Sequence, residues 1–123
     1  MFEVIVREKF CAAHQIEGYR GKCSELHGHN WIMEIRFQIN KLDGLGMSLD
    51  FANAKELLRE VVGSLDHSFL NKNPLLAGEN PTAERLVIVI YNLVSAKTPA
   101  DIKIASVTIW ESDNSAVTYF PEK

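Results

Sequence analysis

Cysteines, long apolar runs and an excess of one charge are all scarce in this sequence, and each shortage excludes a class of protein. Two cysteines, Cys11 and Cys23, are too few for a disulfide framework, so reduced thiols in the cytoplasm are expected. The opening "MFEVIVREKF" mixes charged with apolar residues, unlike a signal peptide. No apolar run approaches the roughly 20 residues that span a bilayer. The formal net charge is -3, and residues of both signs are interspersed, so the sequence provides no basic surface for nucleic acid. We therefore expect a cytoplasmic protein without membrane or nucleic-acid partners.

The remaining composition is that of an ordinary globular domain. Hydrophobic residues make up 46% of the chain and charged residues 24%, so the chain can bury a core without disulfides. No internal repeat, low-complexity tract or linker divides it. We expect one domain that spans residues 1–123.

Hydrophobic periodicity predicts an α+β fold. Apolar and polar residues alternate over residues 2–13 and 31–40, which is typical of strands, and two closing strands are expected at 102–111 and 116–120. The segment between the first two strands contains glycines and polar residues that suit a long hairpin loop. With two helices between the strand pairs, the order ββααββ predicts a four-stranded antiparallel sheet that carries two helices on one face.

Capping residues predict where the two helices lie. Asp50 is expected to cap a helix over residues 51–62, and Gly63 to end it. Asn80 and Pro81 are expected to begin the second helix, because proline is well tolerated at the first helical position. The β-branched run at 87–90 would also suit a strand. Between the helices, the segment from Asp66 to Pro81 is expected to be an irregular loop.

Three of the four histidines fall on the apolar faces of the first two strands. His27 and His29 are two residues apart, so the alternation of the second strand places both on the face of Trp31. The alternation of the first strand places His14 on its own apolar face. If these strands pair as a hairpin, the three imidazoles converge at one end of the core.

Three convergent imidazoles suit Zn²⁺, which binds histidine nitrogen at about 2.0–2.1 Å in tetrahedral sites. Three protein ligands leave the fourth position for water or substrate, which is the catalytic pattern. In one alternative, the histidines only cap the sheet and bond to backbone. In another, Cys23 closes a structural site. Three histidines on one face weaken the first alternative, and nothing else in the sequence requires the second.

Three further groups offer acid–base or recognition chemistry. A thiolate at Cys23, in a polar loop, would serve as a base if a nearby cation lowered its pKa. Asp66 could orient the imidazole of His67 if both lie in a loop. Glu111, at the end of the third strand, could accept two parallel donors from a guanidine-like edge. The alternatives are an incidental loop thiol, a surface Asp-His pair and a solvated strand end.

Taken together, these residues resemble the 6-pyruvoyltetrahydropterin synthase / 6-carboxytetrahydropterin synthase family. The resemblance covers nearly the whole chain and includes, in order, "FCAAH", "CSELHGHNW", "MSLDF", "LDHSFLN", "NPTAE" and "WES". It implies the tunnelling fold, in which trimers close their sheets into a barrel and two trimers stack, with active sites at subunit interfaces. We therefore expect a homo-oligomer, either a trimer or a dimer of trimers.

The resemblance also implies a role for each candidate residue. His14, His27 and His29 would bind zinc, which would hold the side-chain hydroxyls of 7,8-dihydroneopterin triphosphate. Cys23 would be the general base, and Asp66 and His67 would relay protons as triphosphate leaves. Glu111 would anchor the amino-pyrimidine edge of the pterin, while Thr82 and Glu84 would help to shape the pocket. No redox cofactor is expected.

Loop length indicates the branch of the family. Three residues separate Cys23 from His-Gly-His, as in the bacterial queuosine-pathway enzymes, whereas the biopterin-pathway enzymes tend to have a longer spacer. Members that divert the substrate to folate carry a glutamate in place of the cysteine. The expected products are 6-carboxy-5,6,7,8-tetrahydropterin, acetaldehyde and triphosphate. Elimination to a 6-pyruvoyl product, a non-catalytic pterin- or purine-binding module and a metal-storage protein are the alternatives.

Overall fold

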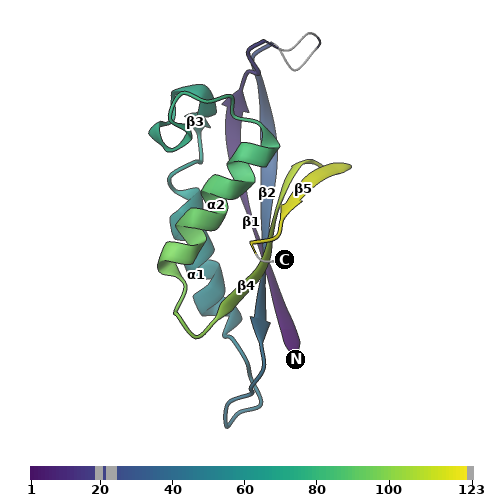
Figure 1. The fold of residues 1–123 in the computed structure, drawn as a ribbon, viewed down its shortest axis with the longest axis vertical. Coiled ribbons are helices and arrows are strands. Elements are labelled where there is room, and N and C mark those ends of the chain that lie inside the picture. The colour runs from purple at the N-terminus through teal and green to yellow at the C-terminus, as the bar shows by residue number, and fades with distance from the viewer. Residues whose placement is uncertain (19–20, 22–24, 122–123) are drawn as a thin grey trace.

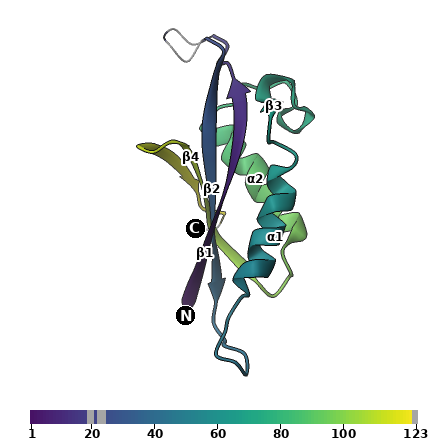
Figure 2. The ribbon, with the colours of Figure 1, turned by 180° about the vertical axis from the view of Figure 1, so that it is seen from behind.

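The computed structural model describes residues 1–18, 21 and 25–121. In it, one sheet lies against two helices that both cover the same face (Figure 1). Seen from behind, the other face of the sheet carries no helix among the described residues (Figure 2). The elements are β1 (Phe2–His14), β2 (His27–Ile39), α1 (Phe51–Val62), β3 (Ser68–Phe69), the short 3₁₀ helices η2 (Leu70–Lys72) and η3 (Pro74–Leu76), α2 (Ala83–Lys97), β4 (Lys103–Ser112) and β5 (Ser115–Tyr119).

The β1–β2 hairpin is the longest unit of the sheet, and it follows the expected alternation. The antiparallel register runs from Phe2 opposite Ile39 to His14 opposite His27. Both strands extend beyond the expected bounds at the hairpin end, so all three predicted zinc ligands lie within the strands. On the helix-facing side, the rings of Phe10 and Trp31 lie parallel with centroids 6.1 Å apart.

The expectation of four antiparallel strands is wrong in one respect, because the sheet has a fifth strand. Its order is β3-β1-β2-β4-β5, and β3 pairs in parallel with β1 through Ala12–Ser68 and Ala13–Phe69. The backbone of Cys11 fixes this contact: its N–H donates to Asp66 Oδ1 at 2.8 Å, and its carbonyl accepts from His67 N at 2.6 Å. A strand of two residues is too short to produce a periodic pattern.

The two helices lie where they were expected, but the second begins later. Asp50 caps α1 by accepting from the N–H of Ala52 at 2.8 Å, and Gly63 follows the last residue, as predicted. The expected start of α2 at Asn80 and Pro81 is wrong, because the hydroxyl of Thr82 accepts from Arg85 N at 3.2 Å and makes Thr82 the N-cap. A threonine hydroxyl satisfies a free N–H of the first turn, which proline cannot do.

The segment between the helices is ordered by side chains rather than irregular, which corrects the expected loop. Asn71 exchanges hydrogen bonds with the backbone of Gln15, and Asn80 does the same with Glu17. Asn73 caps η3 by accepting from Leu75 N at 3.0 Å. These amide side chains hold the segment against the hairpin end of β1.

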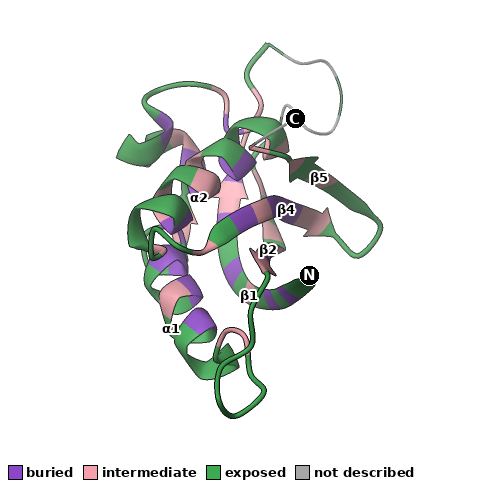
Figure 3. Cartoon of the chain, turned by 60° about the horizontal axis from the view of Figure 1, so that its bottom comes forward, coloured by how far each residue is buried: buried purple, intermediate pink, exposed green. Residues whose placement is uncertain are grey.

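The hydrophobic core lies between the sheet and the two helices. Buried segments are coloured on both helices and on β1 and β4 in Figure 3. Leu58 of α1, Leu86 of α2 and Ile109 of β4 are fully buried there. The β-branched run of α2 is helical because Val87 and Ile90 lie on the face that packs on this core. None of the helices in the described part of the chain is long and apolar enough to cross a membrane.

Candidate active site

The predicted convergence of the three histidines is confirmed. His14 lies opposite His27 in the β1–β2 register, and His29 lies opposite Ala12, one step further along the same face. The ring centroids are 4.5 Å apart for His14–His27, 4.6 Å for His27–His29 and 5.2 Å for His14–His29. The hairpin alone therefore builds the cluster.

Two backbone carbonyls determine how the first two rings are protonated. His14 Nδ1 lies 2.8 Å from the carbonyl oxygen of Pro81, and His27 Nδ1 lies 2.7 Å from that of Glu25. Because a carbonyl oxygen can only accept, each Nδ1 is the donor, and in a neutral ring each Nε2 then carries a lone pair. Nevertheless, the two Nε2 atoms face each other at 2.9 Å. Two lone pairs at this distance repel unless a proton or a metal cation lies between them.

Burial favours the neutral form of two of the rings. The pKa of His14 lies below its ordinary value, first because the ring is desolvated; its hydrogen bond to Pro81 acts in the opposite direction. Desolvation is also the main cause that lowers the pKa of His29, against the charge of Glu111. Neutral imidazole is the form that binds metals. The backbone-capping alternative explains each Nδ1 contact but leaves the Nε2 atoms without a function.

Trp31 forms the inner wall of the cluster. Its ring is fully buried and meets His14 and His29 edge-to-face, at centroid distances of 5.1 and 5.2 Å. Its indole N–H donates to the carbonyl of Ala12 at 3.2 Å. The sequence indicated that Trp31 shares a face with the histidines, but not that it packs directly against two of them.

Glu111 joins the histidines, which was not predicted. Its Oε1 lies 3.4 Å from His29 Nε2 and its Oε2 lies 3.9 Å from His14 Nε2. One ligand atom from each of the three histidines and from Glu111 lies within 4.8 Å of the others. His29 Nε2 is buried and has no hydrogen-bond partner among the described residues. Three imidazole nitrogens and a carboxylate form a donor set that suits a metal ion such as zinc.

Asp66 and His67 form the oriented pair that was predicted. Asp66 Oδ2 lies 3.0 Å from His67 Nδ1, and the ring of His67 is 82% exposed. The N–H of Cys11 lowers the pKa of Asp66, and the contact with His67 lowers it further, so this carboxylate is ionised at neutral pH. His67 adopts φ 57°, a left-handed conformation that is costly for a residue with a side chain.

The other predicted site residues lie beside the cluster or outside the described chain. Cys23 lies outside the described residues. Thr82 caps α2 and Glu84 lies in its first turn. The neighbouring Pro81 carbonyl bonds His14, so the start of this helix adjoins the histidines. The pocket-shaping role of Thr82 and Glu84 stays a prediction, and each already has a role in the helix.

A groove of about 520 Å³ lies at the hairpin end of β1 and β2, beside β3. Cys11, Gly28, His29 and His67 are among the residues that line it. A Cβ added to Gly28 would meet nothing within 4 Å, so the chain itself leaves this space open. His67 of the predicted proton relay and His29 of the predicted zinc ligands therefore border the same groove.

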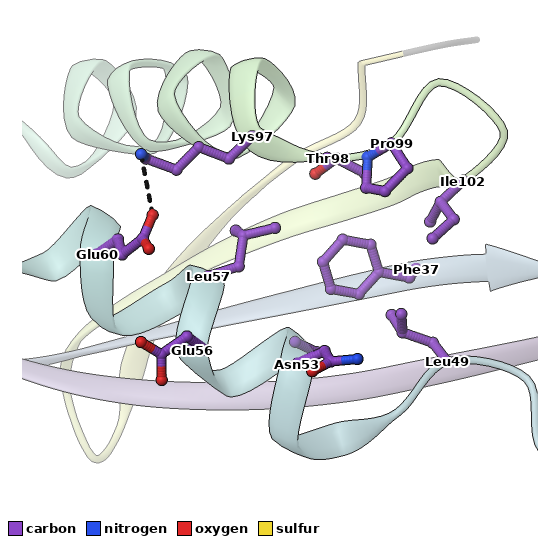
Figure 4. Close-up of a pocket in the computed structure, with 11 residues that line it drawn as sticks. Phe37, Leu49, Asn53, Glu56, Leu57, Glu60, Lys97, Thr98, Pro99 and Ile102 are labelled. Atoms are coloured by element: carbon purple, nitrogen blue, oxygen red, sulfur yellow. Dashed lines mark ion pairs between the residues drawn. The ribbon is translucent and has the colours of Figure 1, made fainter.

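A second hollow, of about 350 Å³, lies between α1 and the end of α2 (Figure 4). Its walls include the apolar side chains of Phe37, Leu57 and Ile102, and an ion pair of 3.1 Å between Lys97 and Glu60 crosses its rim. Its lining includes none of the candidate site residues. We therefore place the chemistry at the histidines.

Comparison with known proteins gives a consistent result. A model of the family described as 6-pyruvoyl tetrahydropterin synthase matches residues 3–122. Proteins named 6-carboxy-5,6,7,8-tetrahydropterin synthase are 31% identical in Rickettsia typhi, over 95% of this chain and 99% of that protein, and 35% identical in Synechocystis sp., over 95% and 92%. A dihydroneopterin monophosphate aldolase of Pyrococcus furiosus is 32% identical over 93% of each chain.

A solved structure shows the same fold. That of 6-pyruvoyl tetrahydropterin synthase from Caenorhabditis elegans aligns with a TM-score of 0.85 and 23% identity, over 98% of this chain and 96% of that chain. The arrangement of sheet and helices is therefore shared across nearly the full length. With the family match over residues 3–122, this chain belongs to the 6-pyruvoyl tetrahydropterin synthase family.

Proposed function

We propose that this chain is a zinc-dependent 6-carboxy-5,6,7,8-tetrahydropterin synthase. Its substrate would be 7,8-dihydroneopterin triphosphate, and its products 6-carboxy-5,6,7,8-tetrahydropterin, acetaldehyde and triphosphate, in queuosine biosynthesis. The observation that carries the proposal is the pair of facing Nε2 atoms, 2.9 Å apart, of His14 and His27. A proton or a metal cation must lie between these two atoms, and two relatives of that name are 31% and 35% identical over 95% of this chain. The expected cytoplasmic location remains a prediction.

The residues divide into a metal-holding group and a proton-moving group. His14, His27 and His29 would hold zinc. When bound, zinc makes the side-chain hydroxyls of the pterin and the adjoining carbon more acidic and stabilises developing negative charge. Two carbonyls, of Pro81 and Glu25, hold the rings of His14 and His27 in the orientation that presents Nε2 to the metal.

Proton transfer would depend on Cys23 and on the Asp66–His67 pair. In this proposal, the thiolate of Cys23 removes a proton from the substrate side chain. Asp66, ionised and 3.0 Å from Nδ1, holds a proton on that atom of His67, so that the exposed Nε2 can exchange protons with the substrate. Glu111 would accept the two N–H donors of the amino-pyrimidine edge, and Thr82 and Glu84 would line the pocket.

The test is to identify the products made by purified, zinc-loaded protein from 7,8-dihydroneopterin triphosphate, using mass spectrometry for the pterin and a separate assay for acetaldehyde. A 6-carboxy product together with acetaldehyde supports the proposal. A 6-pyruvoyl product without acetaldehyde would overturn it in favour of triphosphate elimination. Unchanged substrate despite bound zinc and bound pterin would favour a non-catalytic pterin-binding module.

The aldolase relative supplies a second candidate function, because its identity of 32% is similar to that of the synthases. Dihydroneopterin monophosphate should therefore be assayed in parallel with the triphosphate. Retro-aldol cleavage of the monophosphate would leave a one-carbon substituent on the pterin. Cys23 argues against a folate-directed enzyme, because family members that divert substrate to folate carry glutamate at the corresponding position.

A further inference from the structure

The position of Glu111 in the sheet directs its carboxylate toward the histidines. In the pairing of β4 with β5, Trp110 lies opposite Ala116 and Ser112 lies opposite Ser115, so Glu111 is the extra residue of a β-bulge. A bulge bends its strand and re-aims a side chain, and bulges are common next to active sites. On its helix-facing side, the strand then presents Glu111 beyond the buried Ile109.

Several distances within the cluster are close to those between ligands of one metal ion. Around a tetrahedral zinc ion with bonds of about 2.0–2.2 Å, neighbouring ligand atoms lie roughly 3.3 Å apart. Oε1 of Glu111 lies 3.4 Å from His29 Nε2 and Oε2 lies 3.9 Å from His14 Nε2, and the Nε2 atoms of His14 and His27 lie 2.9 Å apart. All four ligand atoms lie within 4.8 Å of one another. The carboxylate is therefore close enough to the three imidazoles to share a metal ion with them.

A direct hydrogen bond does not account for this contact. His29 Nε2 is buried and, among the described residues, has no hydrogen-bond partner, although the carboxylate oxygen is only 3.4 Å away. Without a shared cation, a carboxylate oxygen and the lone pairs of the neighbouring imidazoles would be electron-rich groups in close contact. A divalent ion bound to all four groups would make the same arrangement favourable.

We propose that Glu111 is the fourth metal ligand of the substrate-free enzyme and that the substrate displaces it. The proposal builds on the function proposed above. A site closed by four protein ligands is typical of structural zinc, whereas catalysis requires an open position. The substrate side chain would take the place of the carboxylate on the metal. Glu111, released and 32% exposed, would then be free to accept the amino-pyrimidine edge of the same pterin.

This exchange would give one residue two successive partners. Before substrate binds, the carboxylate would neutralise part of the metal charge and occupy the open position. Afterwards, its contact with the pterin would hold the substrate while the metal holds the side chain. Glu111 would therefore couple recognition of the pterin ring to opening of the metal site.

Cobalt(II) substituted for zinc provides the test, because its visible spectrum reports the number and type of ligands. We would compare wild type with Glu111→Gln and with Asp113→Asn, which removes an exposed carboxylate two residues further along the same chain segment. We expect Glu111→Gln to change the cobalt spectrum and to weaken metal binding by about ten-fold or more in competition with a chelator. Asp113→Asn should match wild type in both measurements, and neopterin should shift the spectrum of the wild-type protein.

Each outcome has a definite meaning. If Glu111→Gln is folded by circular dichroism and gives the wild-type spectrum and affinity, Glu111 is not a ligand and the proposal is wrong. If Glu111→Gln does not fold, Glu111→Asp replaces it, and an unchanged spectrum in that variant counts against the proposal. If neither wild type nor any variant binds cobalt, both the role of Glu111 as a metal ligand and the proposed zinc-dependent function are wrong. If the cobalt spectrum depends on Glu111 but the protein does not turn over the pterin triphosphate, Glu111 is a metal ligand and only the proposed function is wrong.

Discussion

At the scale of single residues, the hydrogen bonds behind the histidines matter as much as the histidines themselves. The carbonyls of Pro81 and Glu25 accept from Nδ1 of His14 and His27 and so orient both Nε2 atoms toward a common point. Such partners of metal ligands fix the tautomer and raise the basicity of the ring. Backbone carbonyls are present at every residue, so no sequence pattern could have identified these two.

Substitutions of His27 and Cys23 should separate metal binding from proton transfer. We expect His27→Ala to lose both bound zinc and turnover, because it removes one of the three imidazoles. Cys23→Ala should retain zinc but lose turnover by about 10²-fold or more, the usual contribution of a general base. Zinc would be measured by atomic emission and turnover by product formation.

Cys11→Ala is the matched control for the cysteine substitution. Cys11 is an exposed free thiol on the opposite face of β1, where Sγ lies 3.0 Å from Asn30 Oδ1. We expect this variant to keep both zinc and turnover. Wild-type turnover in Cys23→Ala would refute the role proposed for Cys23, and full zinc content in His27→Ala would refute the metal site.

Thr82 has a role in the helix and a predicted role in the pocket, and two substitutions separate them. Thr82→Ala removes the hydroxyl that caps α2 and should lower the free energy of unfolding by about 1 kcal/mol. Thr82→Asn should keep the cap and the stability. If Thr82 also contacts substrate, Thr82→Asn will raise KM although it folds normally. Urea denaturation and steady-state kinetics measure the two effects.

Asp50→Ala is the control for this pair. It removes the equivalent cap from α1, where Asp50 accepts from Ala52 N at 2.8 Å, and should lower stability similarly without a change in KM. An unaltered KM in Thr82→Asn would limit Thr82 to capping the helix.

At the scale of secondary-structure elements, the attachment of β3 to β1 should depend on pH. The N–H of Cys11 and the ring of His67 hold the pKa of Asp66 below its ordinary value. A carboxyl group with a lowered folded-state pKa stabilises the protein above its unfolded pKa of about 3.9, and this contribution is lost as the pH falls through the folded-state pKa. Asp66→Asn should therefore lower the urea midpoint at pH 7, and its difference from wild type should narrow toward pH 3.

Asp101→Asn, a change of an exposed carboxylate in the turn before β4, is the control for this measurement. It should have the wild-type midpoint at pH 7. A difference between Asp66→Asn and wild type that stayed constant across the pH range would show that the charge of Asp66 does not hold β3.

Elements with a long periodic pattern could be predicted from the sequence, and short ones could not. The bounds of α1 and the alternation of β1 and β2 were sufficient to predict the convergence of the three histidines. The strand β3 has two residues and depends on hydrogen bonds from Asp66 and His67, so it has no pattern of its own. Glu111 lies at a bulge between β4 and β5, which only the pairing of the two strands reveals.

At the scale of the whole molecule, both edges of the sheet are open in the part of the chain that the structure describes. β3 covers β1 only at Ala12 and Ala13, and β5 ends the sheet on the other side. The face without helices carries ion pairs, among them Glu34 with Arg7 at 2.7 Å and with Arg36 at 3.3 Å. Open edges tend to pair with other chains unless they are protected. A head-to-tail contact of β1 with the β5 of a second copy would bury both edges, and repetition of that contact can close a ring.

We therefore expect the protein in solution to have the mass of three or six copies of the 13.9 kDa chain, as measured by light scattering after gel filtration.

Ile5 on β1 and Ile88 on α2 are both 44% exposed, so replacing either with lysine changes a similar amount of apolar surface. Ile5→Lys lies on a strand at an open edge and should shift the mass toward the monomer, whereas Ile88→Lys on the helix should leave it unchanged. A monomeric wild type, or dissociation caused by Ile88→Lys but not by Ile5→Lys, would show that the sheet edges do not form the contact. If active sites lie between subunits, turnover per chain should fall together with the mass in Ile5→Lys, because the monomer retains the histidine cluster but lacks the neighbouring copy.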